Sequence, residues 1–213
     1  MNKIATSSKI FENVKFGNNI TIEDFVIIGN PPYKKKNGEL KTVIGDNSLI
    51  RSHSVLYAGN LIGDNFQTGN NVNIREENLI GNNVSVGTKT VIEFKTKIED
   101  NVRIHSQAFI PEYCELKEGC WIGPNAVLTN AKYPISARSK EFIDGVIVGK
   151  GAIIGANSTI LPGIKIGEYS LIGAGSVVTQ DVQAKKVLTG NPARVIDDID
   201  NLKYSDGGKA YNE

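Results

Sequence analysis

A six-residue period runs through nearly the whole chain. Every sixth position from Ile44 to Leu128 carries Ile, Leu or Val, and Thr68 is the single substitution in that run. The same phase occurs earlier, from Ile4 to Ile28, and later, from Val148 to Val178. An amphipathic helix needs a period near 3.6 and a half-buried strand needs a period of 2, so neither accounts for the pattern.

Two further features accompany the period. Glycine often follows the apolar residue, as at Gly63 and Gly155, and a small residue often stands two positions before it, as at Ser48 and Ser158. Such hexads are typical of a parallel β-helix, in which each hexad is one short strand and one turn. Three hexads close a triangular coil of about 18 residues. The sequence therefore predicts an all-β solenoid of roughly eight to nine coils, each rising about 4.8 Å.

Two interruptions break the repeat. The first spans about residues 29–43, where a basic segment includes Pro31 and Lys34, and the second spans about 129–147. Both are predicted loops, and the second is the stronger candidate for an active-site loop, because solenoids often carry function where the repeat is interrupted. We expect one β-helix domain over residues 1–196 and a short C-terminal tail over 197–213.

Charge and composition exclude several classes. The formal net charge is +1, so no basic field suggests a nucleic-acid partner. No apolar run has the length of a signal peptide core or of a membrane span, which predicts a soluble, cytoplasmic protein without membrane insertion. His53 and His105 are the only histidines, so a three-histidine metal site cannot form and no metal is expected. Cys114 and Cys120 occupy inward positions, which predicts reduced, buried thiols.

The chain around the second loop resembles a known family. IGPNAVLTNAKYPISARS and VGKGAIIGANSTILPGIKIGEYSLIGAGSVVTQDV, followed by GNPARVI, are similar to the hexapeptide acyltransferases. Within that family they most resemble the N-acetyltransferases that act on amino groups of nucleotide-linked sugars. The resemblance implies a left-handed β-helix, a homotrimer, and acetyl-CoA bound in a groove between adjacent subunits.

The same resemblance implies a set of cofactor-binding residues near the C-terminal end. GAGSVVT and GNPARV are the segments most specific for CoA-dependent acyl transfer. Their outward turns offer bare backbone amides, and an arginine suits phosphate because its fork can bind two oxygens. The expected cofactor-binding residues are Gly155, Ala156, Gly173, Ala174, Gly190, Pro192 and Arg194.

The nucleophile decides which reaction these enzymes carry out. O-acetyltransferases of the family have a histidine base in the loop just before a proline. The corresponding segment here runs from Asn130 to Pro134 and contains no histidine. An amine needs alignment more than a strong base, and Asn130 matches the asparagine of the N-acetyltransferases. His105, which points outward beside Gly87 and Gly123, remains the alternative catalytic residue.

Five residues are candidate contacts for the acceptor substrate: Arg75, Glu76, Tyr133, Arg138 and His53. Arg75 should also stack on Glu93, one coil away, as an ion pair. The sequence thus predicts an acetyl-CoA-dependent N-acetyltransferase for a UDP- or dTDP-linked amino sugar in surface glycan synthesis. Two alternatives remain open: an O-acetyltransferase that uses His105 or His53, and a non-catalytic solenoid scaffold.

Overall fold

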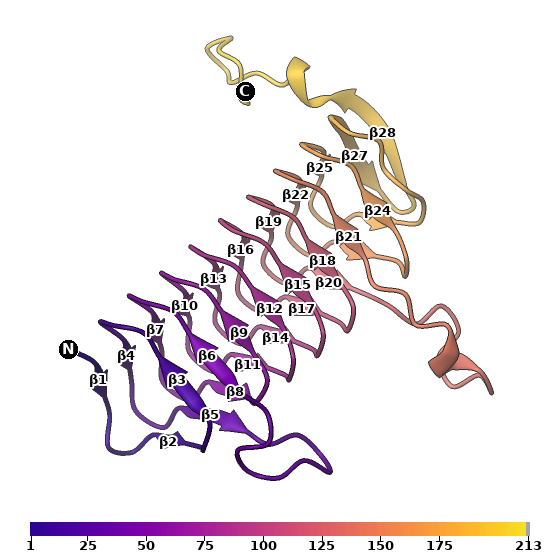
Figure 1. Ribbon diagram of the computed structural model, residues 1–213. Coiled ribbons are helices and arrows are strands. Elements are labelled where there is room, and N and C mark those ends of the chain that lie inside the picture. Colours follow the sequence, from indigo (N-terminus) through magenta and orange to yellow (C-terminus); the bar gives the residue numbers. More distant parts are fainter. Residues whose placement is uncertain (212–213) are drawn as a thin grey trace.

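The protein folds as a left-handed parallel β-helix of hexapeptide repeats (Figure 1). The structure is a computed structural model, and it describes residues 1–211. Short strands stack into three parallel sheets, here called A, B and C, which form the three faces of a triangular prism. The predicted all-β solenoid is therefore confirmed.

The strands of each sheet follow one another along the axis. Sheet A consists of β1 (Lys3–Ile4), β4 (Thr21–Ile22), β7 (Leu49–Ile50), β10 (Gln67–Thr68), β13 (Ser85–Val86), β16 (Arg103–Ile104), β19 (Trp121–Ile122), β22 (Ile153–Ile154), β25 (Leu171–Ile172), β27 (Lys186–Gly190) and β28 (Ala193–Asp198). Sheet B consists of β2 (Lys9–Ile10), β5 (Ile27–Asn30), β8 (Val55–Tyr57), β11 (Asn73–Ile74), β14 (Val91–Ile92), β17 (Phe109–Ile110), β20 (Val127–Leu128), β23 (Thr159–Ile160) and β26 (Val177–Val178). Sheet C consists of β3 (Val14–Phe16), β6 (Thr42–Ile44), β9 (Leu61–Ile62), β12 (Leu79–Ile80), β15 (Lys97–Ile98), β18 (Glu115–Leu116), β21 (Ile147–Val148) and β24 (Lys165–Ile166).

The repeat positions form the core. Residues 18 apart pair directly across the ladder, as Ile74 does with Ile92, so each apolar side chain stacks on its equivalent in the next coil. Ile74 and Ile92 are both fully buried. Thr68 takes the same inward place, and its hydroxyl accepts a hydrogen bond from the Arg51 backbone N–H at 2.9 Å. A polar residue is tolerated there because its oxygen has a partner.

The turns depend on backbone conformations that few residues adopt easily. Asn65, Asn83 and Asn101 occupy successive turns with φ near +60°, a region that asparagine tolerates better than most residues. Gly87 has a different reason to be glycine, because a Cβ there would lie 2.3 Å from the backbone nitrogen of Ser106 in the next coil. These turns let consecutive coils stack closely.

A ladder of buried polar side chains ties three consecutive coils together. The Asn60 amide donates to the backbone carbonyls of Tyr57 and Arg75, at 2.7 and 2.8 Å. Asn78 donates to the Arg75 carbonyl at 2.9 Å and accepts from the backbone N–H of Thr96 at 2.7 Å. All three ladder residues, Asn60, Asn78 and Thr96, are fully buried. The ladder holds the turn that carries Arg75.

Both interruptions leave sheet B and return to sheet C, so they project from the same edge of the prism (Figure 1). The first lies between Asn30, where β5 ends, and Thr42, where β6 begins. The second lies between Leu128 and Ile147. It contains the short 3-10 helix η1 (Ser139–Glu141), and a bridge between Ala131 and Ile143 closes its base.

The C-terminal end differs from a simple tail. β27 continues sheet A in parallel beside β25, and β28 returns antiparallel along β27. β28 crosses the expected boundary at 196/197, and the 3-10 helix η2 (Ile199–Asn201) follows it. The period stops here, so sequence reasoning had no signal for this hairpin. Residues 212 and 213 of the expected tail lie outside the described residues.

Candidate functional site

The prism has three long edges, and the candidate residues lie on two of them. We call the row of turns from sheet A to sheet B the AB edge, and the row from sheet B to sheet C the BC edge. Gly155, Ala156, Gly173 and Ala174 follow β22 and β25, so they lie on the AB edge. Asn130 and Arg75 follow β20 and β11, so they lie on the BC edge.

The expected cofactor residues come together at the C-terminal end of the AB edge. β27 runs parallel to β25 with Leu188 opposite Ile172, so the hairpin tip that holds Gly190 and Pro192 meets this edge. Contact is direct, because a Cβ on Gly173 would lie 3.1 Å from the Thr189 hydroxyl. Arg194 follows the tip and is exposed, with Nη1 donating to the Ala193 carbonyl at 2.9 Å.

An apolar groove adjoins these turns on the outer face of sheet A. Its walls include Trp121, Ile153 and Leu171, and Tyr211 from the C-terminal segment closes one side. Gly155, Gly173 and Ala174 line the same groove. The Gly155 and Gly173 N–H groups donate to the Ile172 and Leu188 carbonyls, whereas within residues 1–211 the Ala174 N–H makes no hydrogen bond. A free amide beside an apolar surface suits an extended chain that alternates amide and methylene groups.

His105 lies on the same edge, two coils before Ala156. Its ring contacts Trp121, with a centroid separation of 4.6 Å. Burial lowers the pKa of His105, and the positive charge of Arg103 lowers it further. The imidazole is therefore held in its neutral form, which can accept a proton. His53, also on the AB edge, instead stacks on Phe25 with centroids 5.1 Å apart.

The BC edge carries a connected group of polar side chains. The Asn130 amide donates to a carboxylate oxygen of Glu112 at 2.6 Å. Arg75 binds Glu76 through two nitrogens, at 2.9 and 3.1 Å, and reaches Glu93 at 3.4 Å. The expected ion pair between Arg75 and Glu93 is thus confirmed, but the guanidinium is largely taken up by Glu76.

These side chains stand on consecutive turns. Arg75, Glu93, Glu112 and Asn130 follow β11, β14, β17 and β20, so each lies about 4.8 Å along the axis from the last. Burial raises the pKa of Glu93, and the charges of Glu112 and Glu76 act in the same direction against the opposing effect of Arg75. The edge is thus locally acidic and partly desolvated.

Tyr133 and Arg138 lie farther out on the second loop. They line a pocket of their own with Asp144, Pro162 and Gly163, and Asn130 is not part of it. Arg138 pairs with Glu141 at 2.8 Å and stands over the Phe142 ring. Within the chain, the structure does not bring these two residues to Asn130.

Sequence reasoning missed Glu112 on the BC edge and Trp121, which lies on β19 and contacts His105 of the AB edge. Glu112 could have been found from the 18-residue stacking, which places it one coil before Asn130. Trp121 precedes inward Ile122 and is the only tryptophan. The stacking rule places Trp121 on Arg103, and the structure shows that its ring also contacts His105.

The AB and BC edges are separated by the strands of sheet B. The outward side chains of this sheet are mostly apolar: Ile27, Val55, Val91, Phe109, Val127 and Val177, with Lys9, Asn73 and Thr159 as the polar members. A largely apolar sheet face is typical of a surface that meets another protein.

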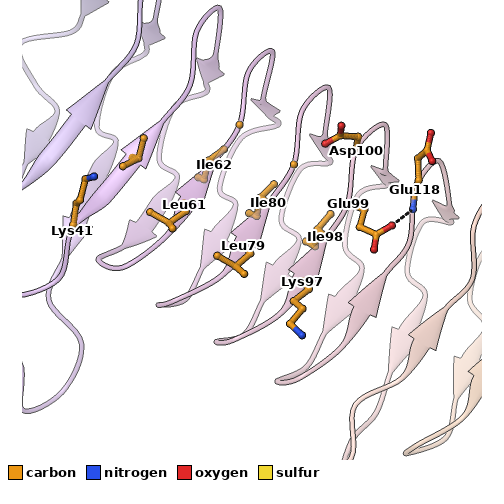
Figure 2. A pocket seen from close by; sticks show the side chains of 13 residues that line it. Lys41, Leu61, Ile62, Leu79, Ile80, Lys97, Ile98, Glu99, Asp100 and Glu118 are labelled. Atoms are coloured by element: carbon orange, nitrogen blue, oxygen red, sulfur yellow. Dashed lines mark hydrogen bonds between the residues drawn. The ribbon is translucent and has the colours of Figure 1, made fainter.

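Sheet C has a less continuous apolar strip. Figure 2 shows Leu61 and Leu79 projecting from the outer face, where they are 43% and 49% exposed, while Ile62 and Ile80 point into the core. Charged residues follow, and the backbone N–H of Glu118 donates to Glu99 at 3.0 Å. This broad trough contains none of the predicted site residues.

Cys114 and Cys120 are free and fully buried, as expected. Burial raises the pKa of both thiols to about 12, so neither is a nucleophile at neutral pH.

Within residues 1–211, no three acidic, histidine or cysteine side chains are grouped as metal ligands. The same part of the chain holds no helix with the length and apolar character of a membrane span.

Comparisons with known proteins agree with the fold. Residues 145–180 match the family described as bacterial transferase hexapeptide (six repeats), which is the stretch that holds Gly155, Ala156, Gly173 and Ala174. The solved structure of LpxA, a UDP-N-acetylglucosamine acyltransferase from Bacteroides fragilis, is similar with a TM-score of 0.58. The two share 16% identity, over 91% of this chain and 73% of that one.

Curated relatives are similar over a shorter stretch. The 2,3,4,5-tetrahydropyridine-2,6-dicarboxylate N-acetyltransferase of Halalkalibacterium halodurans is 49% identical over 83 residues, which is 39% of this chain and 32% of that protein. The enzyme of the same name from Alkaliphilus metalliredigens is 42% identical over 86 residues, 40% of this chain and 34% of that protein. The match thus spans about a third of these relatives' length.

Proposed function

We propose that this protein is a cytoplasmic acetyl-CoA-dependent N-acetyltransferase that acts on the amino group of a UDP- or dTDP-linked amino sugar, in surface glycan synthesis. The observation that carries the proposal is the C-terminal AB edge. There, bare turns, an apolar groove and an exposed arginine adjoin one another within and beside the stretch that matches the transferase repeats.

The AB edge suits the acyl donor. The pantetheine arm would lie along the groove, where backbone amides at Ala156 and Ala174 can meet its amide groups. Arg194 would approach the phosphates at the far end, because a guanidinium binds phosphate oxygens in pairs. No metal is part of this proposal.

The BC edge suits an amine acceptor. Acetyl transfer forms a C–N bond as the neutral amine attacks the thioester carbonyl, and the C–S bond then breaks to release the CoA thiolate. The amine must lose one proton, which the thiolate finally receives. Asn130 would hold the amine, and the Glu112 carboxylate beside it would attract and orient the N–H groups.

These two halves can meet between copies of the chain. We propose a homotrimer in which the apolar face of sheet B points toward a threefold axis. Sheet B is bounded by the AB edge on one side and the BC edge on the other. Threefold rotation therefore brings the AB edge of one copy against the BC edge of the next. His105 follows β16, Asn130 follows β20 in the next coil, and Ala156 follows β22 one coil later, so Asn130 of one copy would stand between the heights of His105 and Ala156 of its neighbour.

A second acceptor is favoured by one specific observation. The curated relatives are named for a tetrahydropyridine dicarboxylate, and their identity to this chain reaches 49% over 83 residues. That acceptor is a small dianion without a nucleotide. It shares the N-acetyl transfer step and differs in how the acceptor is held.

The direct test is an acetylation assay with a panel of acceptors. The panel contains UDP- and dTDP-linked amino sugars, their hydroxyl analogues and tetrahydropyridine-2,6-dicarboxylate, and thiol release from acetyl-CoA reports transfer. We expect turnover with an amino sugar and retained turnover in His105→Ala and His53→Ala. Preference for the hydroxyl sugar together with loss of activity in His105→Ala would establish the O-acetyltransferase instead. If no acceptor in the panel supports thiol release, the non-catalytic scaffold would be favoured.

A further inference from the structure

A second groove lies on sheet A, on the N-terminal side of His105. We call it the arginine groove, and its lining includes Arg51, Gln67, Ser85, Thr88, Arg103 and His105. The remaining lining residues are small or apolar, and no aspartate or glutamate is among them. Two guanidinium groups, an imidazole, hydroxyls and an amide form a surface rich in hydrogen-bond donors.

The two arginines of this groove are available to a ligand. Among residues 1–211, the arginines in ion pairs are Arg51, Arg75 and Arg138, so Arg103 has no carboxylate partner there. Arg51 reaches Glu23 only at 3.8 Å, and its side chain is 44% exposed. Arg75, the arginine expected from the sequence to meet the acceptor, is instead held by Glu76 at 2.9 Å.

The spacing of the groove fits an extended dianion. Arg51 follows β7 and Arg103 lies on β16, which are three coils apart in sheet A, a separation of about 14 Å along the axis. Gln67 and Ser85 lie on the two strands between them. Long side chains that reach inward from both ends can meet two phosphates joined by one oxygen.

We propose that the arginine groove binds the diphosphate of a nucleotide-linked acceptor. This inference rests on the proposed N-acetyl transfer, because it places the diphosphate of the acceptor on the AB edge, where the acyl donor is proposed to bind. His105 stands at the C-terminal end of the groove, and Ala156 lies two coils farther on, about 10 Å away along the axis. An acceptor anchored by its diphosphate would therefore extend its sugar toward the thioester end of the donor.

The position of the groove, away from the reacting amine, has a consequence for the kinetics. The groove provides charge at a distance from the reacting amine, so it binds the acceptor without touching the atoms that react. Loss of an arginine should then weaken acceptor binding and raise KM for the acceptor, while kcat at saturation changes little. If the same arginines had only a structural role, their loss would not raise KM for the acceptor while leaving kcat unchanged.

The test is calorimetric binding of UDP, dTDP and pyrophosphate to the intact protein without acetyl-CoA. Arg51→Gln and Arg103→Gln each remove one guanidinium from an exposed position, and Lys165→Gln, an exposed cation on sheet C, is the matched control. We expect a rise in Kd of about tenfold or more for each arginine variant, and no change for the control. Circular dichroism verifies that all variants remain folded.

Three outcomes would overturn the inference. Equal nucleotide diphosphate affinity in the parent and in Arg103→Gln excludes the groove, and so does a parent that binds no nucleotide diphosphate. Pyridine-2,6-dicarboxylate is titrated as a further ligand. If its binding weakens in the two arginine variants while nucleotide diphosphate binding does not, the groove binds carboxylates instead. These titrations contain no acyl donor, so they are independent of the acetylation assay, which decides the proposed function separately.

Discussion

Replacing Asn78 by alanine tests whether the buried polar ladder stabilises the coils beneath the BC edge. Asn78 Oδ1 accepts from both the backbone N–H and the hydroxyl of Thr96, at 2.7 and 2.9 Å. The Arg75 carbonyl would keep its bond from Asn60, but the two Thr96 donors would be left without an acceptor in the core. Each unpaired buried donor costs about 1–3 kcal/mol, so the free energy of unfolding should fall by about 2–6 kcal/mol.

The measurement is urea denaturation followed by the fluorescence of Trp121 and by circular dichroism. Asn70→Ala is the matched control, because Asn70 is an exposed turn asparagine whose side chain makes no hydrogen bond within residues 1–211. That variant should lose less than about 0.5 kcal/mol. Equal losses in the two variants, or a loss below about 1 kcal/mol for Asn78→Ala, would refute the assignment of the ladder as a stabilising element.

Three further predictions concern the two edges. Asn130→Ala removes the hydrogen bond with which this side chain would align the amine, worth about 1–3 kcal/mol, so kcat/KM should fall roughly 10- to 100-fold; unchanged kinetics would exclude Asn130 from alignment. Arg194→Ala should raise the apparent acetyl-CoA requirement more than it changes kcat, and equal CoA binding by variant and parent would show that the donor lies elsewhere. Burial raises the pKa of Glu93 above the 4.5 of an ordinary glutamate, so the folded state binds this proton more tightly than the unfolded chain, and ionisation costs stability as pH rises through the folded pKa. Glu93→Gln should therefore gain stability relative to the parent as the pH rises above 4.5, whereas a variant that loses stability in that range would show that the pair with Arg75 dominates.

The solenoid could be read from the sequence because its period repeats the same physical requirement in every coil. Inward residues such as Ile74 and Ile92 must stack on one another, and that stacking also placed Arg75 beside Glu93. The hairpin of β27 and β28 carries no period, so its packing against sheet A depends on contacts that a single sequence does not display. The polar ladder was missed because Asn78 fills a place where a small residue is usual.

The sequence named candidate residues for the site but not their arrangement. Resemblance identified Ala156, Ala174 and Asn130, and strand order then assigned the first two to the AB edge and Asn130 to the BC edge. No pattern along one chain states how the AB and BC edges would face one another in the proposed trimer. Glu112 became visible only when stacking placed its carboxylate 2.6 Å from the Asn130 amide.

Mixed trimers test the composite site most directly. One chain carries Ala174→Trp, which fills the AB edge at an exposed turn, and the other carries Asn130→Ala with Glu112→Ala, which impairs the BC edge. Each variant alone should be nearly inactive. Trimers formed from an equal mixture should regain about a quarter of the parent activity per site, because that fraction of interfaces joins two intact edges. Mixed trimers, verified by mass, that stay as inactive as the single variants would contradict the account.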